Sequence, residues 1–124
     1  MIGNFSDLHK KAEKAIYTEG AAFLNIMTPC PRGWRYDTAD IMKICKLAVE
    51  TCYWPMFEVE HGKWRLTYEP KKKLPIEDFL REQQIKHLFK PGNEDLLAQF
   101  QAEVDRRWKI FSINVHDNPG GINR

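Results

Sequence analysis

The strongest restriction on the fold comes from a short apolar run, AAFLNIM, at residues 21–27. Gly20 precedes the run. A loop in which one proline stands on each side of a cysteine follows it. An apolar run of this length is typical of a strand buried on both faces, as in parallel sheets covered by helices. Such a strand needs neighbouring strands because its backbone groups must be hydrogen-bonded. The sequence therefore predicts a buried strand for which the chain supplies few partners.

Helical periodicity surrounds this predicted strand. Residues 5–18 repeat apolar side chains at helical spacing, which predicts a helix just before the strand. A second helix is predicted from a cap at Asp37 or Thr38 to about residue 51. Helix, glycine and buried strand in this order indicate an α/β fold with a parallel sheet.

The second half of the chain predicts a hairpin followed by helices. Residues 57–60 and 63–68 alternate apolar and polar side chains around a His-Gly pair, which favours a β-hairpin. A short helix is predicted over residues 76–88, after a basic linker bounded by prolines. Asn93 is the expected cap of a final helix.

Composition excludes several classes of protein. The chain has 124 residues, of which 43% are apolar, and this suits a single globular domain. Nineteen Lys and Arg against 17 Asp and Glu give a net charge of +2. No strong basic excess is present, so we expect neither a nucleic acid nor a membrane as partner. The N-terminus lacks the pattern of a secretory signal, which predicts a cytoplasmic protein with reduced thiols.

The three cysteines differ in their predicted roles. Cys45 and Cys52 lie on one stripe of the second predicted helix, where cysteine usually acts as a small buried hydrophobe. Cys30 lies between prolines in a rigid loop directly after the predicted strand, where α/β sheets present ligand-binding groups. Cys30 is therefore a candidate thiolate ligand or redox thiol; the alternative is a loop cysteine without chemistry. No C-x-x-C spacing is present, so a metal site must take ligands from elsewhere.

The other polar residues give no catalytic assignment. Glu58 and Glu60 fall on one face of a predicted strand and are interpreted as a solvated edge. The sequence holds no dinucleotide-binding, Walker, H-E-x-x-H or nucleophile-elbow motif. The histidines fall on unrelated elements, which favours surface or capping roles: His9, His61, His87 and His116.

Four segments together resemble a known family. They are FLNIMTPCPRGWRY (23–36), LAVET (47–51), YWPMFEVE (53–60) and LPIEDFL (74–80). In this order they closely resemble the C-terminal part of the β subunit of pyruvate:ferredoxin oxidoreductase (pyruvate synthase) and its 2-oxoacid relatives. The resemblance runs from about Asp7 to Trp108. The Cys-Pro-x-Gly-Trp form is similar to the pyruvate and branched-chain members. After Leu80 the chain departs from the family pattern, because REQQIKHL lacks its Gly-Arg.

The resemblance implies a fold class and three parts of the chain. The fold is expected to be α/β, a C-terminal fragment of a thiamine-diphosphate-binding three-layer domain with a β-hairpin and a helical C-terminal extension. Residues 1–69 are expected to be the portion of that domain with the hairpin, and residues 70–113 the helical extension. Residues 114–124 are expected to form a disordered tail.

The resemblance also implies cofactors. In that family the β subunit binds thiamine diphosphate with Mg²⁺ and carries a [4Fe–4S] cluster. By its motif, Cys30 matches the fourth cluster ligand. The family's early cysteines and its Gly-Asp-Gly…Asn motif are absent from this sequence. The isolated chain is therefore expected to bind no cofactor and to be inactive.

Two functions remain open at this point. The first is a cluster-ligating part of an enzyme that oxidatively decarboxylates a 2-oxoacid, expected to be pyruvate, to acetyl-CoA and passes electrons to ferredoxin. Its partners are the other portions and subunits of the oxidoreductase, and ferredoxin through the complex. The alternative is a non-catalytic interaction module, or a truncated relic, of the same subunit.

Overall fold

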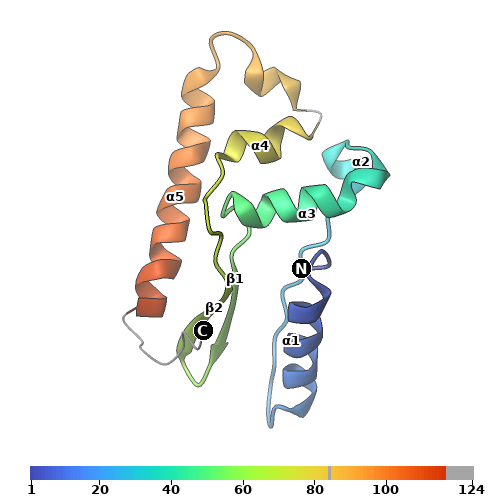
Figure 1. Ribbon diagram of the computed structural model, residues 1–124. Helices are drawn as coiled ribbons and strands as arrows, with labels where there is room; N and C mark the ends of the chain where they lie inside the picture. Colours follow the sequence, from blue (N-terminus) through green and yellow to red (C-terminus); the bar gives the residue numbers. More distant parts are fainter. Residues whose placement is uncertain (84, 117–124) are drawn as a thin grey trace.

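Helices dominate the fold of this computed structural model, which describes residues 1–83 and 85–116. A two-stranded antiparallel sheet is the only sheet in these ranges. Chain order is easiest to follow in Figure 1. The helices and strands are α1 (Phe5–Tyr17), α2 (Pro31–Trp34), the 3₁₀ helix η1 (Thr38–Asp40), α3 (Ile41–Glu50), β1 (Met56–Glu60), β2 (Lys63–Tyr68), α4 (Ile76–Arg81), the 3₁₀ helix η2 (Lys86–Phe89) and α5 (Glu94–His116).

Helix α1 confirms the prediction for residues 5–18 but contributes nothing to the core. Asn4 caps it, since the Asn4 side chain accepts a hydrogen bond of 3.1 Å from the backbone N–H of Asp7. None of the α1 residues is buried. The exposed fraction of Ile16 is 76%, and that of Tyr17 is 80%. Among the described residues, therefore, no surface buries the apolar stripe of α1.

The predicted buried strand at residues 21–27 is wrong for the chain as it stands. The segment is extended, but it pairs with no strand among the described residues, and residues 21–26 are exposed. Met27 alone is buried, at 7% exposed. The physical reason is that a strand needs a hydrogen-bonded neighbour, and the segment bonds to neither of the two strands described, β1 and β2, which pair with each other.

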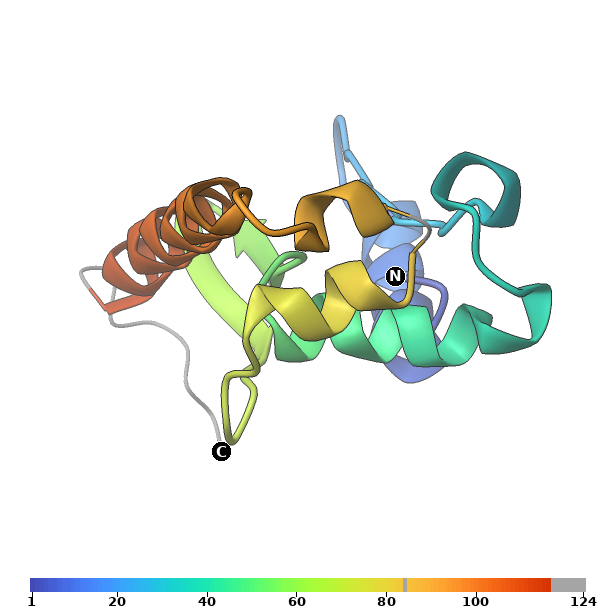
Figure 2. The same ribbon diagram turned by 90° about the horizontal axis from the view of Figure 1, so that it is seen from above.

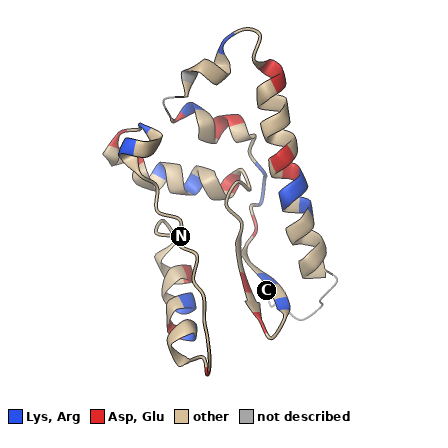
Figure 3. Ribbon diagram, turned by 180° about the vertical axis from the view of Figure 1, so that it is seen from behind, with Lys and Arg blue, Asp and Glu red and all other residues tan. Residues whose placement is uncertain are grey.

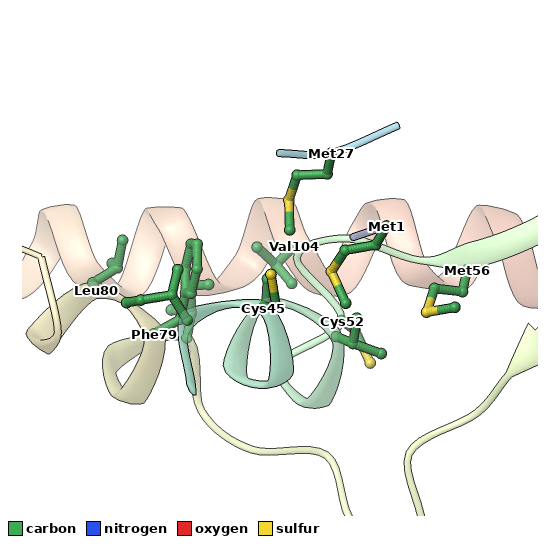
Figure 4. Close-up of a cluster of buried hydrophobic side chains, with 12 residues drawn as sticks. Met1, Met27, Cys45, Cys52, Met56, Phe79, Leu80 and Val104 are labelled. Carbon is green, nitrogen blue, oxygen red and sulfur yellow. The ribbon is translucent and has the colours of Figure 1, made fainter. Parts of the chain in front are cut away.

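The core lies where α3, α4 and α5 meet. Figures 1 and 2 show α3 and α4 side by side, with α5 crossing near their ends. The second predicted helix is confirmed, since η1 and α3 together span residues 38–50 and Asp37 caps the start. Figure 4 shows the cluster, with Met27 pointing toward α3. The buried residues of α3 form one stripe: Ile44, Cys45, Ala48 and Val49.

Phe79 connects three segments of this core. Its side chain is 2% exposed. It meets Trp34 edge-on at a ring-centroid distance of 5.7 Å and stacks on Tyr53 at 4.8 Å. Aromatic contacts of this geometry add to the stabilisation from buried area. The loop around α2 is thus attached to the helical core through one ring.

The predicted hairpin is confirmed. In the antiparallel register Phe57 lies opposite Leu66 and Val59 opposite Trp64. His61 and Gly62 both have positive φ, 51° and 76°, as a two-residue type I′ turn requires. The hairpin packs on α5 through an aromatic group formed by Phe57, Trp64 and Phe111.

The C-terminal helices differ from their predicted limits. α4 ends at Arg81, so the helix predicted for residues 76–88 is too long. A separate 3₁₀ turn, η2, follows, and its residues Leu88 and Phe89 pack against the core. α5 continues to His116, past the predicted start of the tail at residue 114, because Val115 is buried. The rest of that tail lies outside the described residues. No helix in the described ranges is long and apolar enough to cross a membrane.

Limited proteolysis tests this division between core and periphery. We expect chymotrypsin to cut first at Phe23 and Tyr17, which are 89% and 80% exposed, and late at Phe79. Cleavage at Phe79 requires the core to open, so it should be slower by about a hundredfold. Mass spectrometry of a time course gives the order. In Phe23→Ala, the cut at Phe23 should vanish without earlier cleavage at Phe79; simultaneous cleavage at all three sites would contradict the fold.

Candidate functional site

Two buried residues and one aromatic contact hold the loop that carries Cys30. Met27 and Pro29, just before it, are both buried. Trp34, just after it, packs edge-on against Phe79. Because both ends of the loop are attached to the core, the exposed Cys30 between them has a fixed backbone.

Cys30 occupies the N-cap position of the one-turn helix α2. Its sulfur accepts a hydrogen bond from the backbone N–H of Gly33 at 3.4 Å, and its carbonyl accepts one from Trp34 at 2.9 Å. Pro31 fits the first helical position because a backbone N–H at that position has no hydrogen-bond partner within the helix, so its absence in proline costs nothing. The Pro-Cys-Pro-Arg-Gly order thus produces a local structure that holds the sulfur at the surface.

The chain leaves this turn through an unusual backbone conformation. Arg35 has a positive φ of 54°, and its N–H donates to the carbonyl of Pro31. Tyr36 follows, and its hydroxyl is buried without a hydrogen-bond partner among the described residues. Burial raises the pKa of Tyr36, and the thiols of Cys45 and Cys30 add to the effect. The phenol therefore stays neutral beside the loop.

Cys45 and Cys52 are core residues, as the sequence predicts, although Cys52 lies just past the end of α3. Their exposed fractions are 0% and 3%. Burial raises the pKa of Cys45, and it raises the pKa of Cys52 from 9.0 to about 11. A buried thiol with a raised pKa is a poor ligand, because metals bind the thiolate.

The described residues fit an iron–sulfur cluster at one corner only. A [4Fe–4S] cluster takes four thiolate ligands, and Cys30 is the one exposed cysteine here. In the part of the chain that the structure describes, no three His, Cys, Asp or Glu side chains gather at a possible metal site. The sequence also has no Gly-Asp-Gly segment.

A charged group between α1 and the hairpin was missed by sequence reasoning. Lys14 Nζ lies 2.8 Å from a carboxylate oxygen of Glu58 and 2.6 Å from one of Glu60, and Arg65 also contacts Glu58. Burial alone would raise the pKa of Glu58, but hydrogen bonds from Lys14 and Arg65 outweigh it and the pKa is lowered. Glu58 is thus an ion-pair partner. Lys14 and Glu58 are separated by 44 positions in the sequence, which explains why no local signal predicts the contact.

The histidines lie apart. Each is exposed and sits on a different element, α1, the hairpin turn, η2 and the end of α5: His9, His61, His87 and His116. They are distant in chain order from Cys30 and join no ligand group with it in the described ranges.

Comparison with known proteins gives a consistent set of relatives. The chain is 42% identical over 105 residues to pyruvate synthase subunit PorB of Thermotoga maritima, covering 83% of this chain and 32% of that subunit. It is 40% identical over 114 residues to PorB of Methanosarcina barkeri, covering 90% of this chain and 38% of that subunit. PorB is the β subunit of pyruvate:ferredoxin oxidoreductase.

This chain is homologous to part of the pyruvate synthase β subunit. The ketoisovalerate oxidoreductase subunit VorB of Pyrococcus furiosus is also similar, 37% identical over 110 residues, with 86% of this chain and 35% of VorB covered. No family model matches the chain. The chain spans about a third of the length of these PorB and VorB relatives.

Thiol reactivity tests the assignment of the three cysteines. At pH 8 we expect one thiol, that of Cys30, to react rapidly with a chromogenic disulfide reagent. A pKa of about 11 for Cys52 instead of 9.0 lowers its thiolate fraction at this pH by about a hundredfold, besides the block by burial. Cys30→Ser should remove the fast phase, and guanidinium should expose the remaining thiols. A fast phase that survives in Cys30→Ser would contradict the geometry.

Proposed function

We propose that this chain is the C-terminal part of the β subunit of a 2-oxoacid:ferredoxin oxidoreductase, and that Cys30 is one ligand of its [4Fe–4S] cluster. The observation that carries the proposal is the contrast among the cysteines. Cys30 alone is held at the surface by a rigid loop, while Cys45 and Cys52 are sealed in the core. The similarity to PorB and VorB supports the class of enzyme.

The loop suits a ligand for electron transfer. Its backbone is fixed by the contacts of Trp34 and by the hydrogen bonds around Cys30, so the sulfur moves little when the charge of a bound cluster changes. Arg32 is exposed on the same turn. A positive charge and backbone N–H groups near a cluster favour its reduced, more negative state. Thiamine diphosphate with Mg²⁺, when bound in the complete subunit, supplies the chemistry of decarboxylation.

The complete reaction needs polypeptide beyond this chain. We propose oxidative decarboxylation of pyruvate or a branched 2-oxoacid to the acyl-CoA, with electrons passed to ferredoxin. The relatives are about three times as long as the matched region. The remaining two thirds of the β subunit would supply the other cluster ligands and the residues that bind the diphosphate. Its partners are therefore the rest of that subunit, the other subunits and, through the complex, ferredoxin.

A second function has an observation of its own. Helix α1 buries none of its residues, and the exposed Phe5 and Ile16 give it an apolar surface. This surface alone would serve a non-catalytic interaction module that keeps the docking face of the subunit. Such a module would retain docking and have no need of Cys30, which makes Cys30 the discriminating residue.

Cluster reconstitution tests the role of Cys30. We expect the chain alone to form no stable cluster with iron and sulfide, since it offers one exposed ligand. Co-expression with the unmatched portion of Thermotoga maritima PorB should restore one, seen in visible absorbance and low-temperature EPR. Cys30→Ser should weaken both signals by making one corner labile.

Cys45→Ala and Cys52→Ala are the matched controls. Each removes a cysteine of the same chain from the core and should cost only packing, about 1 kcal/mol or less, with the cluster intact. If Cys30→Ser leaves the spectra unchanged and either core variant abolishes them, the ligand assignment fails.

Calorimetry tests the expected lack of cofactor binding by the chain alone. Titration with thiamine diphosphate and Mg²⁺ should give no heat above dilution, because the sequence carries no diphosphate-binding Gly-Asp-Gly loop. The co-expressed pair serves as the positive control. An affinity near the micromolar range for the isolated chain would show that it holds a site of its own.

A further inference from the structure

Helix α5 carries two stripes of side chains with different surroundings. The first faces inward: Val104 and Trp108 belong to the core, and Phe111 packs on the hairpin. The second runs along the flank of the helix, with residues alternately four and three positions apart, which is the heptad spacing of paired helices. This flank stripe consists of Leu96, Phe100, Glu103, Arg107, Ile110 and Asn114.

The apolar members of the flank stripe are open to solvent. Leu96 is 48% exposed, Phe100 37% and Ile110 46%. Figures 1 and 2 both show α5 at the edge of the fold. Phe100 also stacks on Tyr53 at a ring-centroid distance of 6.3 Å, so its ring is held in place at the surface. The helix thus offers three apolar side chains spread over about 21 Å of its length.

Two opposite charges lie in the middle of the flank stripe. Glu103 and Arg107 are both exposed and are four positions apart. Figure 3 shows acidic and basic positions following one another along this part of α5. Hydrogen bonds from Arg106 lower the pKa of Glu103, so its carboxylate is charged at neutral pH. The stripe therefore has apolar side chains toward both ends and one charge of each sign at its centre.

This order of residues is self-complementary in an antiparallel helix pair. A two-fold axis requires that each contact between two copies occurs twice, with the two residues exchanged. If two α5 helices run in opposite directions with the axis level with residue 105, every member of the flank stripe faces another member. The contacts, each occurring twice, are Phe100 with Ile110, Glu103 with Arg107, and Leu96 with Asn114.

A parallel pair lacks this match. It would place Glu103 against Glu103 and Arg107 against Arg107, and like charges across an interface are destabilising. The antiparallel pair instead places each carboxylate opposite a guanidinium. The central charges therefore select the orientation of the two helices, and the apolar residues on either side supply the buried area.

We propose that the flank stripe of α5 is a docking surface for a second copy of this chain, with the two α5 helices packed antiparallel about a two-fold axis. The contact would extend from residue 96 to residue 114, about 27 Å of helix. A single pair of helices buries less than the roughly 1,200 Å² at which stable interfaces begin, so the dimer is expected to be weak. The net charge of +2 adds little repulsion between copies. The inference goes beyond the proposed function and does not depend on it.

Sedimentation of the full chain measures the expected dimer. Between about 1 μM and about 1 mM, the average mass should rise from that of the monomer toward that of the dimer, with a Kd on the order of 100 μM. A chain that stays monomeric over this whole range overturns the proposal.

Two variants with the same chemical change locate the contact. Ile110→Asp should weaken the dimer by about tenfold or more, because it places a charge against the ring of Phe100 in the second copy. Ile110 is half-exposed in the monomer, so the circular dichroism should not change. Ile16→Asp is the matched control on α1, where Ile16 is 76% exposed, and it should leave the Kd unchanged. The reverse result would assign self-association to α1 and overturn the proposed surface.

A charge exchange tests the pairing at the centre of the stripe. Glu103→Arg places like charges opposite each other at Arg107 and should weaken the dimer by about tenfold. Adding Arg107→Glu in the same chain restores opposite charges and should return the Kd to within about twofold of the original. A change in the monomer alone would not be rescued in this way. Failure of the double variant to recover overturns the register.

Spin labels test the antiparallel orientation. The labels are attached singly through Asp95→Cys or Ala102→Cys, both at exposed positions of α5, in a Cys30→Ser background where the remaining cysteines are buried. In the antiparallel pair, residue 95 lies far from the axis and residue 102 close to it. The label separation within the dimer should therefore be longer at residue 95 by on the order of 10–20 Å. Equal separations at the two positions would indicate a parallel pair and overturn the proposal.

Discussion

Phe79 packs against Trp34 on one side and Tyr53 on the other, and the described structure depends on this contact. It joins α4 to the turn after α3 and to the loop that carries Cys30. Because α2 has only four residues, it cannot be stable by itself. Its position is therefore set by the tertiary contact of Trp34. The exposed sulfur of Cys30 is thus connected to the buried ring of Phe79 through the short helix α2 and Trp34.

Stability is distributed unevenly as a result. The stripe of α3 is sealed against α4 and α5, whereas α1 buries no residue and contacts the hairpin through Lys11 and Lys14. Exposed or partly exposed ion pairs contribute little, about 0–1 kcal/mol each. Helix α1 and the exposed residues 21–26 that follow it therefore contribute little to the buried core.

The cysteines show how burial separates chemical roles. Cys45 and Cys52 differ from Cys30 in environment and not in side-chain chemistry. The low polarity around the buried thiols raises their pKa and keeps them protonated, which makes them packing residues. The similarity to PorB and VorB supports the proposed enzyme class, and the environment of each cysteine supplies the reason why Cys30 is the candidate ligand.

The sequence by itself determined the local elements. Spacing of apolar residues predicted α1, α3 and the start of α5, and the His-Gly pair predicted the hairpin turn, because these depend on neighbours within a few residues. Tertiary structure alone decided three features: the unpaired conformation of residues 21–27, the end of α4 at Arg81, and the contact of Lys14 with Glu58. The apolar pattern at residues 21–27 is that of a buried strand, but burial and pairing require a sheet. The sheet among the described residues is the hairpin of β1 and β2, and residues 21–27 do not pair with it, so the segment stays extended and unpaired.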